Sequence, residues 1–490
     1  MFNFSLINLW CTKNLVDSQY LIWKLLAYSN LSKQKQINYF PDPYDSKVEF
    51  VFLNTCGFLS SGRKEMMENL EKLIKAGKKV YLLGCAVQYF NLRSEEVIWG
   101  QKRNFEVGRV WGQKRFERSE EENWGQKRLK RLEENNDLYE KEKKDFETFL
   151  KKNVWKVFLL SWNDLDHISI EKLKKWYNSK EFRDFIFPNS IRAYTDAIYG
   201  YEYLKIAEWC DNHCTFCIIP KIRWKQKSLP MDKILQEVKD MVDSGIKEII
   251  IISQDTTRYW TDLYWQPKLF ELLEKIDQIE WDFVYRILYL YPDIISLNHL
   301  SEFKKLKKFL PYFDIPLQHI SSNVLKKMWR FYDTDYIYKF LDFIKKEFPN
   351  SFVRTNIIVW FPGETESDFQ QLKEFIKKWY FANIALFEYH DEPLAASSKL
   401  PNKVDNQTLK RRFTEISKIV DNELEKKWEN RKWKQIWYVM DFNEEKVIVR
   451  SYLHAPEIDP YDEILWDDII WVYNETWQVD IGDMIEYNLK

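Results

Sequence analysis

Apolar and polar positions along this chain switch between two periodicities, as is typical of an α/β protein. Three apolar runs near the N-terminus are predicted strands: FSLINL (4–9), KVEFVFLN (47–54) and KKVYLLG (78–84). Helix-like segments at 17–28 and 63–77 lie between them. Strands that alternate with helices favour a parallel sheet. We therefore predict an N-terminal α/β domain at residues 1–200.

A second alternating region covers about 201–400. Its strand candidates are YLKIA, EIIIIS, DFVYRIL, YFDIPL, SFVRTNIIV and ANIALFEY. Six β/α units favour an open partial (β/α) barrel whose site lies at the carboxyl ends of the strands. With a helical linker at about 401–430, this predicts a domain at 201–430. Four short strand-like runs then predict a small β-barrel at 431–490.

Residues 91–152 interrupt this pattern. The motif WGQKR occurs there at 99, 111 and 124, among many Lys, Arg and Glu residues. The spacing is too short for a solenoid repeat. We interpret the segment as a low-complexity surface insertion, mobile or loosely helical. Its basic residues could contact RNA, but a solvated charged insertion is the simpler interpretation. Residues 153–200 are expected to pack back on the first domain.

Charge and composition narrow the classes of function. Lys plus Arg number 74 and Asp plus Glu 75, so there is no electrostatic argument for broad nucleic-acid binding. Six cysteines in 490 residues do not form a disulfide framework, and their clustering indicates a reducing compartment and a metal. The start of the chain lacks the features of a signal peptide, and no apolar run is long enough to span a membrane. A soluble cytoplasmic enzyme is expected.

The candidate chemistry centres on EWCDNHCTFCIIP (208–220), which holds Cys210, Cys214 and Cys217. Three thiolates this close can bind one face of a cube-shaped iron–sulfur cluster and leave one iron open for a substrate or cofactor. They are one ligand short of a closed structural site. The alternatives are three buried free cysteines, or a zinc site completed by His213.

The other three cysteines, Cys11, Cys56 and Cys85, each follow one of the N-terminal strands. Loops beyond the carboxyl ends of parallel strands converge on one crevice. We therefore expect these three thiols to meet, although three unrelated buried cysteines are the alternative.

The first cysteine run, with Phe216 before its last cysteine, resembles the signature of the radical S-adenosylmethionine (AdoMet) enzymes. In that family a 4Fe–4S cluster chelates AdoMet and, when reduced, cleaves it to a 5′-deoxyadenosyl radical. The segments CTKNLVDS (11–18), NTCGF (54–58) and GCAVQ (84–88) are similar to the N-terminal domain of the methylthiotransferases. The resemblance implies a second 4Fe–4S cluster on Cys11, Cys56 and Cys85. RSYLHAPEID (450–459) resembles the C-terminal TRAM module of the same family, an OB-like substrate-binding barrel.

Loops at 251–265, 314–321 and 359–369 also match that family, in which such loops hold AdoMet. Polar residues in or near these strands and loops are candidates for AdoMet binding. Each of them could instead make structural hydrogen bonds, and Glu364 could cap the next helix. No acid or base side chain is expected, because radical hydrogen abstraction needs no imidazole; His319 is expected to be structural or substrate-positioning. The cofactor-binding candidates are Gln254, Arg286, Gln318, Arg354 and Glu364.

CTKNLVDS, DIPLQHIS and APEID look most like the RimO-type methylthiotransferases, which modify the β-carbon of an aspartate in a small-subunit ribosomal protein. The resemblance implies two AdoMet molecules, two clusters, a reductant protein and a ribosomal-protein substrate, with no membrane partner. One alternative is a tRNA methylthiotransferase, in which case a nucleic acid is the partner. A non-catalytic iron–sulfur protein is another.

One feature of the composition is abnormal. The chain has 12 Gly and 22 Trp, whereas Gly averages about 7% of residues. Seven tryptophans stand where related methylthiotransferases usually have glycine, a residue that suits tight turns and close backbone approach. Either the pocket is rebuilt, or UGA codons that some bacteria read as glycine have been translated as tryptophan; we expect the second. The seven are Trp10, Trp209, Trp224, Trp260, Trp265, Trp329 and Trp360.

Overall fold

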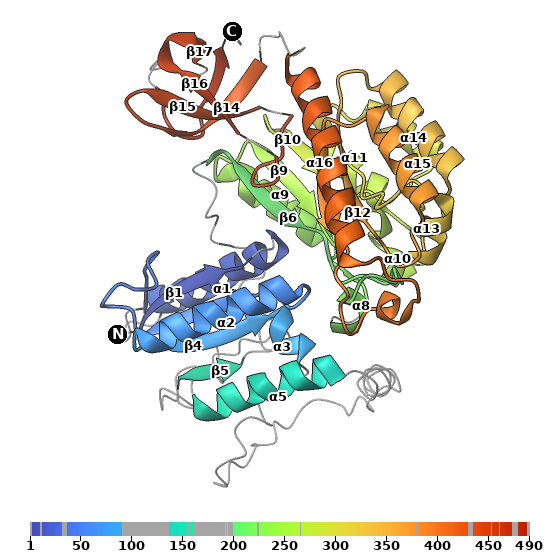
Figure 1. The fold of residues 1–490 in the computed structure, drawn as a ribbon. Helices are drawn as coiled ribbons and strands as arrows, with labels where there is room; N and C mark the ends of the chain where they lie inside the picture. The colour runs from blue at the N-terminus through green and yellow to red at the C-terminus, as the bar shows by residue number, and fades with distance from the viewer. Residues whose placement is uncertain are drawn as a thin grey trace.

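The structure is a computed structural model. It describes residues 2–9, 12–31, 37–90, 137–153, 156–159, 192, 194, 199–222, 225–264, 266–378, 380–429, 435–451, 453–459, 461–472 and 479–487. These residues form three large sheets, which follow one another along the chain (Figure 1). No helix among them is long and apolar enough to cross a membrane.

The N-terminal sheet is parallel, in the order β2-β1-β3-β4-β5. The three strands expected from sequence are present, and β2 and β5 are additional. Its strands are β1 (Phe2–Asn8), β2 (Ile37–Tyr39), β3 (Phe50–Thr55), β4 (Lys79–Gly84) and β5 (Val157–Leu159), with helices α1 (Thr12–Leu31), α2 (Ser60–Lys75), α3 (Cys85–Tyr89) and α5 (Asp137–Lys152).

Strand β3 is buried on both faces, which explains its continuous apolar run. Phe50 and Phe52 pack with the apolar side of α1, whereas Val51 and Leu53 point to the opposite face, toward α2 and α5. Successive side chains of a strand alternate between faces, so this sheet has a separate core on each side.

The expectation of a surface insertion over 91–152 is wrong for its last part. Residues 137–152 form α5, and Tyr139, Phe146 and Leu150 are buried in the same core as β3 and β4. These apolar residues recur at helical spacing within a highly charged segment, so the overall composition concealed an amphipathic helix. The three WGQKR motifs and the rest of the insertion lie outside the described residues, as does most of 160–198.

The second sheet has six parallel strands in the order β13-β12-β11-β10-β9-β6, which confirms the six predicted β/α units. Its strands are β6 (Tyr201–Lys205), β9 (Glu248–Ile252), β10 (Val284–Ile287), β11 (Phe309–Asp314), β12 (Phe352–Val359) and β13 (Asn383–Glu388). The main helices are α9 (Met231–Asp243), α11 (Leu269–Asp277), α13 (Ser322–Lys327), α14 (Thr334–Glu347), α15 (Glu366–Lys377) and α16 (Asn406–Glu429).

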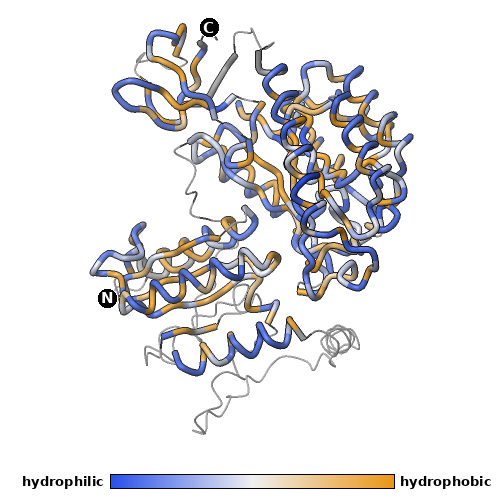
Figure 2. Tube along the Cα trace, in the orientation of Figure 1, coloured by the Kyte–Doolittle hydropathy of each residue, from blue (hydrophilic) through white to orange (hydrophobic). Residues whose placement is uncertain are grey.

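Strand β9 shows how this sheet is covered. Ile249 and Ile251 pack into the large core under α9, α11, α14 and α15. Ile250 and Ile252 point to the inner face, where they share a buried cluster with Val16 of α1 and with Tyr438 of the C-terminal sheet. In Figure 2 apolar residues follow the strands, and polar residues follow the outer sides of the helices. The inner face is therefore closed by the other two parts of the chain.

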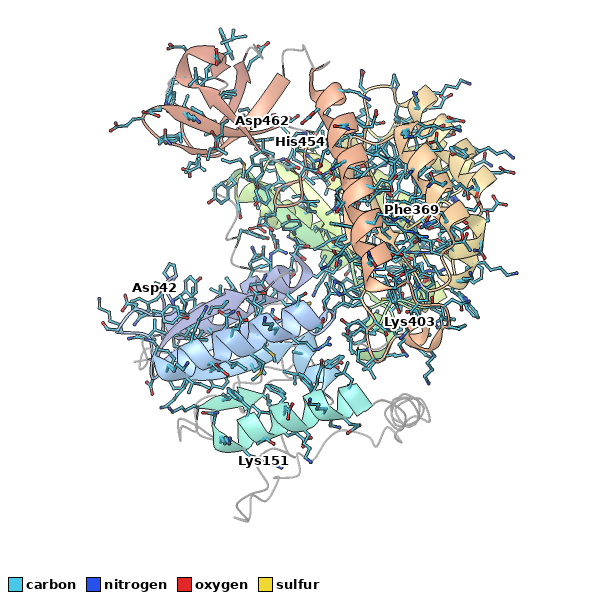
Figure 3. The ribbon with its side chains drawn as sticks, viewed as in Figure 1. Asp42, Lys151, Phe369, Lys403, His454 and Asp462 are labelled. Atoms are coloured by element: carbon cyan, nitrogen blue, oxygen red, sulfur yellow. The ribbon has the colours of Figure 1, made fainter. Side chains whose placement is uncertain are left out.

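The third sheet is antiparallel, in the order β16-β15-β14-β18-β17. Four of its strands were expected from sequence, and β16 is additional. Figure 3 places His454 where this sheet meets the second one, and its ring contacts Phe352 edge-on at 5.1 Å. The strands are β14 (Gln435–Phe442), β15 (Lys446–Ser451), β16 (Asp462–Leu465), β17 (Ile469–Val472) and β18 (Met484–Tyr487).

Candidate iron–sulfur sites

The loop with Cys210, Cys214 and Cys217 follows β6 and the two-residue strand β7 (Ala207–Glu208), at the carboxyl edge of the six-stranded sheet. Its backbone folds on itself: the Asn212 N–H donates to Cys210 Sγ (3.4 Å), and the Cys217 N–H donates to the Cys214 carbonyl (3.0 Å). The Asn212 amide donates to Asp255, just beyond the end of β9 (2.7 Å). The loop is thus held by the next strand of the sheet.

Cys210 and Cys214 are buried, Cys217 is half-buried, and the three thiols are electrostatically coupled. Burial raises the pKa of Cys210 well above its usual value, and Asp255 and Cys217 raise it further. Burial is the largest cause that raises the pKa of Cys217, to about 12, and the electrostatic effect of Cys214 is the second. Burial also raises the pKa of Cys214, and the positive charge of Arg330 partly offsets this rise. Because a metal ligand must be a thiolate, loading this loop releases protons.

The donor set fits an iron–sulfur cluster. None of Cys56, Cys85, Cys210, Cys214 and Cys217 takes part in a disulfide. Among the described residues no three His, Cys, Asp or Glu side chains surround a single metal-ion position. In a cubane cluster each thiolate ligates a different iron, so its ligands do not converge on one point.

Charged groups from outside the cysteine motif surround this loop. Asp255 is buried, accepts from Thr257 (3.1 Å to the backbone N–H) and contacts Arg258 (3.2 Å). Arg330 is 6% exposed, stacks over Tyr291 at 4.6 Å from the ring centroid and has a buried Nε–H without a protein acceptor. Burial alone would lower the pKa of Arg330, but Tyr332, Cys214 and Tyr291 hold it well above its usual value. A permanent positive charge therefore lies near Cys214.

The second cysteine set lies at the carboxyl edge of the N-terminal sheet. Cys56 follows β3 and Cys85 follows β4. Their loops are in close contact, because a Cβ on Gly57 would lie 2.6 Å from the carbonyl carbon of Cys85. Only glycine fits such an approach of two backbones. Cys11 lies outside the described residues.

The start of α1 nevertheless reaches the same edge. The Asn54 amide donates to the Asn14 carbonyl (2.8 Å), and the Asn14 amide donates to the Thr55 carbonyl (3.2 Å). Asn14 is three residues after Cys11, and Thr55 directly precedes Cys56. The motifs CTKNLVDS, NTCGF and GCAVQ are therefore brought together.

The two cysteine regions are also brought together. Cys85 of α3 belongs to the same buried cluster as Ile218 and Ile222, which follow Cys217. Leu394 and Ala395, beyond β13, complete that cluster. Arg63 of α2 donates to Glu392 (3.1 Å), and the Ser60 N–H donates to the same carboxylate (2.9 Å). The carboxyl edges of the two parallel sheets thus share one core and a buried ion pair.

Gln254 and Gln318 lie at carboxyl ends of strands, as expected. Gln254 follows β9, and its Oε1 is buried without a protein donor. Gln318 follows β11 and is held by two backbone hydrogen bonds. Its N–H donates to the Asn356 carbonyl (2.7 Å), and its carbonyl accepts from the Ile358 N–H (2.8 Å). Its φ of 73° is left-handed, and such strain in non-glycine residues is concentrated at functional sites.

Arg286 and Arg354 are engaged with protein partners. Arg286 donates to Glu248 (2.5 Å) and to the Leu453 carbonyl (3.0 Å). Arg450 of β15 donates to the same Glu248 (2.8 Å), so this buried network joins the second and third sheets. Arg354 donates to Asp314 at the end of β11 (2.9 Å). Their role in AdoMet binding stays a prediction.

Glu364 and His319 form part of a buried polar group beneath the end of β12. Arg412 of α16 donates to Glu364 (2.8 Å), and the Glu364 carboxylate accepts from the Phe361 N–H (3.2 Å). The helix cap considered for Glu364 is made by Thr365 and Asp368 instead. His319 is fully buried and accepts a bond from the Ser321 N–H (3.0 Å); burial lowers its pKa to about 3. A neutral imidazole with this partner fits a structural role.

A parallel β/α sheet with three cysteines in the loop after its first strand is the arrangement of the radical AdoMet enzymes, and residues 204–376 match the Radical SAM superfamily. Similarity to known proteins extends over nearly the whole chain. Ribosomal protein uS12 methylthiotransferase RimO of Aquifex aeolicus is 32% identical, covering 92% of this chain and 88% of its own length. The Carboxydothermus hydrogenoformans protein of the same name is 33% identical, covering 94% and 92%. The chain therefore belongs to the RimO family of radical AdoMet methylthiotransferases.

Proposed function

We propose that this enzyme methylthiolates the β-carbon of an aspartate in ribosomal protein uS12, using two 4Fe–4S clusters and two AdoMet molecules. The observation that carries the proposal is the shared core of the two cysteine regions, in which Cys85 lies with Ile218 and Ile222. A sulfur carried at one site must reach a carbon activated at the other, so the two sites must be neighbours.

Cys210, Cys214 and Cys217 would hold the first cluster, and Cys11, Cys56 and Cys85 the second. When bound, the first cluster and AdoMet supply the radical that an unactivated C–H bond requires, and the second carries the sulfur. Gln254 and Gln318 would contact AdoMet from the ends of β9 and β11. The buried ion pair of Arg63 with Glu392 would hold the two sheet edges in register.

The domain assignment belongs to the same proposal. Residues 1–200 would be the methylthiotransferase domain, 201–430 the radical domain with its helical linker, and 431–490 the TRAM module. The APEID segment is anchored on the second sheet, because Asp459 accepts from Tyr312 (2.8 Å) and from Asn383 (2.6 Å). We infer that this anchoring orients the outer strands of the module toward the ribosomal protein.

The test is a reconstituted reaction of the native protein with AdoMet, sulfide, a reductant and uS12. We expect uS12 to gain about 46 Da on one aspartate, the mass of a methylthio group that replaces hydrogen. A uS12 variant with Ala in place of that aspartate should gain nothing. Modification of tRNA but not of uS12 would refute the substrate. Failure to form 5′-deoxyadenosine would favour the non-catalytic alternative.

A further inference from the structure

Four tryptophans in this chain have a backbone conformation that belongs to glycine. Trp209, Trp260, Trp329 and Trp360 have φ values of 65°, 79°, 63° and 56°. A bulky L-residue with φ in this region is a genuine outlier, because its Cβ collides with the neighbouring carbonyl. Among the described residues, these four make up half of the eight non-glycine positions with positive φ.

Trp329 gives the clearest case. It follows α13 and the cap residue Met328, its N–H donates to the Lys326 carbonyl (3.2 Å), and the Arg330 N–H donates to the Leu325 carbonyl (2.9 Å). This pair of bonds defines a Schellman motif, in which the residue after the cap is left-handed and is usually glycine. Trp329 stands at that glycine position.

The same motif ends two other helices in the part of the chain that the structure describes, each time with glycine. After α9, Gly245 has φ 88°, its N–H donates to Val242, and the Ile246 N–H donates to Met241. After α2, Gly77 has φ 77°, its N–H donates to Ile74, and the Lys78 N–H donates to Leu73. The three helix ends share one backbone geometry and differ in the residue at the left-handed position.

Two of the four indole groups, those of Trp209 and Trp360, bury a polar N–H group that makes no hydrogen bond to any described residue. By contrast, Trp466, which is not among the left-handed residues, donates its Nε1–H to the Asn443 carbonyl (2.9 Å) and contacts Phe442 edge-on. Buried Trp N–H groups usually find a partner, so each of these two indoles leaves a polar atom unsatisfied, although the Trp360 ring packs edge-on against Phe413.

We propose that the native residue at positions 209, 260, 329 and 360 is glycine, and that these tryptophans represent UGA codons that the cell decodes as glycine. The inference rests on backbone geometry and composition, and it is independent of the proposed function. It also accounts for part of the imbalance between 12 glycines and 22 tryptophans in this chain, since each recoded codon lowers one count and raises the other.

The decisive measurement is peptide mass spectrometry on the protein from its source organism, together with the gene sequence. We expect glycine in the peptides and UGA in the gene at all four positions. Tryptophan in the peptides, or UGG codons there, would overturn the proposal.

A stability measurement on the recombinant chain tests the physical premise. Each of the four residues is changed to Gly and, separately, to Ala; both changes remove the indole, but only Gly removes the Cβ. We expect each Gly variant to melt roughly 2–4 °C above its Ala partner. Trp23, inside α1, is the matched control, where Ala should melt above Gly because the position is helical. An Ala variant as stable as the Gly variant at the four positions would contradict the premise.

Discussion

The two cysteine sites of this enzyme are assembled in different ways. Cys210, Cys214 and Cys217 lie within one loop, whose shape is fixed by its own backbone and by Asp255. The other proposed site would combine loops from three strands, and the described loops after β3 and β4 pack so closely that Gly57 cannot carry a side chain. The first site depends on a local conformation, whereas the second depends on the whole N-terminal sheet. Damage to one site should therefore leave the other intact.

The largest effect should come from removing the ligands, in the chain with glycine at 209, 260, 329 and 360. Ala at Cys210, Cys214 and Cys217 should lower bound iron from about eight to about four per chain and abolish AdoMet cleavage. Ala at Cys11, Cys56 and Cys85 should cause the same loss of iron but preserve AdoMet cleavage, while methylthio transfer stops. Iron analysis and 5′-deoxyadenosine formation measure the two outcomes. An intact chain with about four irons would refute the two-site proposal.

A single methyl group should separate the two sites. In Gly57→Ala the new Cβ would lie 2.6 Å from the Cys85 backbone, so the two loops must move apart. We expect loss of the N-terminal cluster with retention of the other, measured by iron content and electron paramagnetic resonance. Gly77→Ala is the control: its Cβ would meet nothing within 4 Å, and only its left-handed φ is strained. It should cost about 1 kcal/mol of stability and no iron. Equal iron in both variants would contradict the close-contact explanation.

Arg330 offers a test of electrostatics at the local site. A buried positive charge near Cys214 stabilises the negative charge that reduction adds, whereas an apolar side chain would not, so Arg330 favours the reduced cluster. Arg330→Met should lower the midpoint potential of that cluster by tens of millivolts, where about 59 mV corresponds to a tenfold change in equilibrium. Arg330→Lys should restore part of the shift, and the N-terminal cluster should not change. A redox titration followed by electron paramagnetic resonance distinguishes this from a purely structural role, which would shift neither potential.

A change in stability without loss of iron is expected from the buried network of Glu248 with Arg286 and Arg450, which contains no cysteine. Burial alone would raise the pKa of Glu248, but Arg286 and Arg450 lower it below its usual value. A lowered native pKa means that this carboxylate stabilises the fold above about pH 4.5, and that the contribution is lost as pH falls through the native value. Glu248→Gln should cost about 3 kcal/mol at neutral pH, because two buried cations lose their partner, and should weaken the acid dependence of unfolding. Iron content should not change; a loss of iron would show that the third sheet supports the sites.

Most features formed by residues that are close together in the chain could be predicted from the sequence, whereas most features formed by residues far apart in the chain could not. The central strands of both parallel sheets, such as β3, β4 and β9, were visible as apolar runs because they are buried on both faces. The cysteine loop was visible because its ligands are adjacent in the chain. The buried network of Arg286 with Glu248 and Arg450 was not, because its members are separated by up to 202 residues and their charges look like ordinary surface positions. Helix α5 was missed because its three buried apolar residues are outnumbered by charged ones. Short edge strands such as β2 and β5 carry too few residues to show a period.

The inner face of the second sheet has a consequence for how this protein is made. All six strands have been synthesised by residue 388, yet Ile250 and Ile252 share their buried cluster with Tyr438, Met440 and Ala455. Domains generally fold from the N-terminus during synthesis. Here a complete sheet must wait on the ribosome with one apolar face only partly covered, until the final segment emerges. The nascent chain is therefore most exposed to aggregation, and most dependent on chaperones, during the last fifth of its own translation, after residue 388.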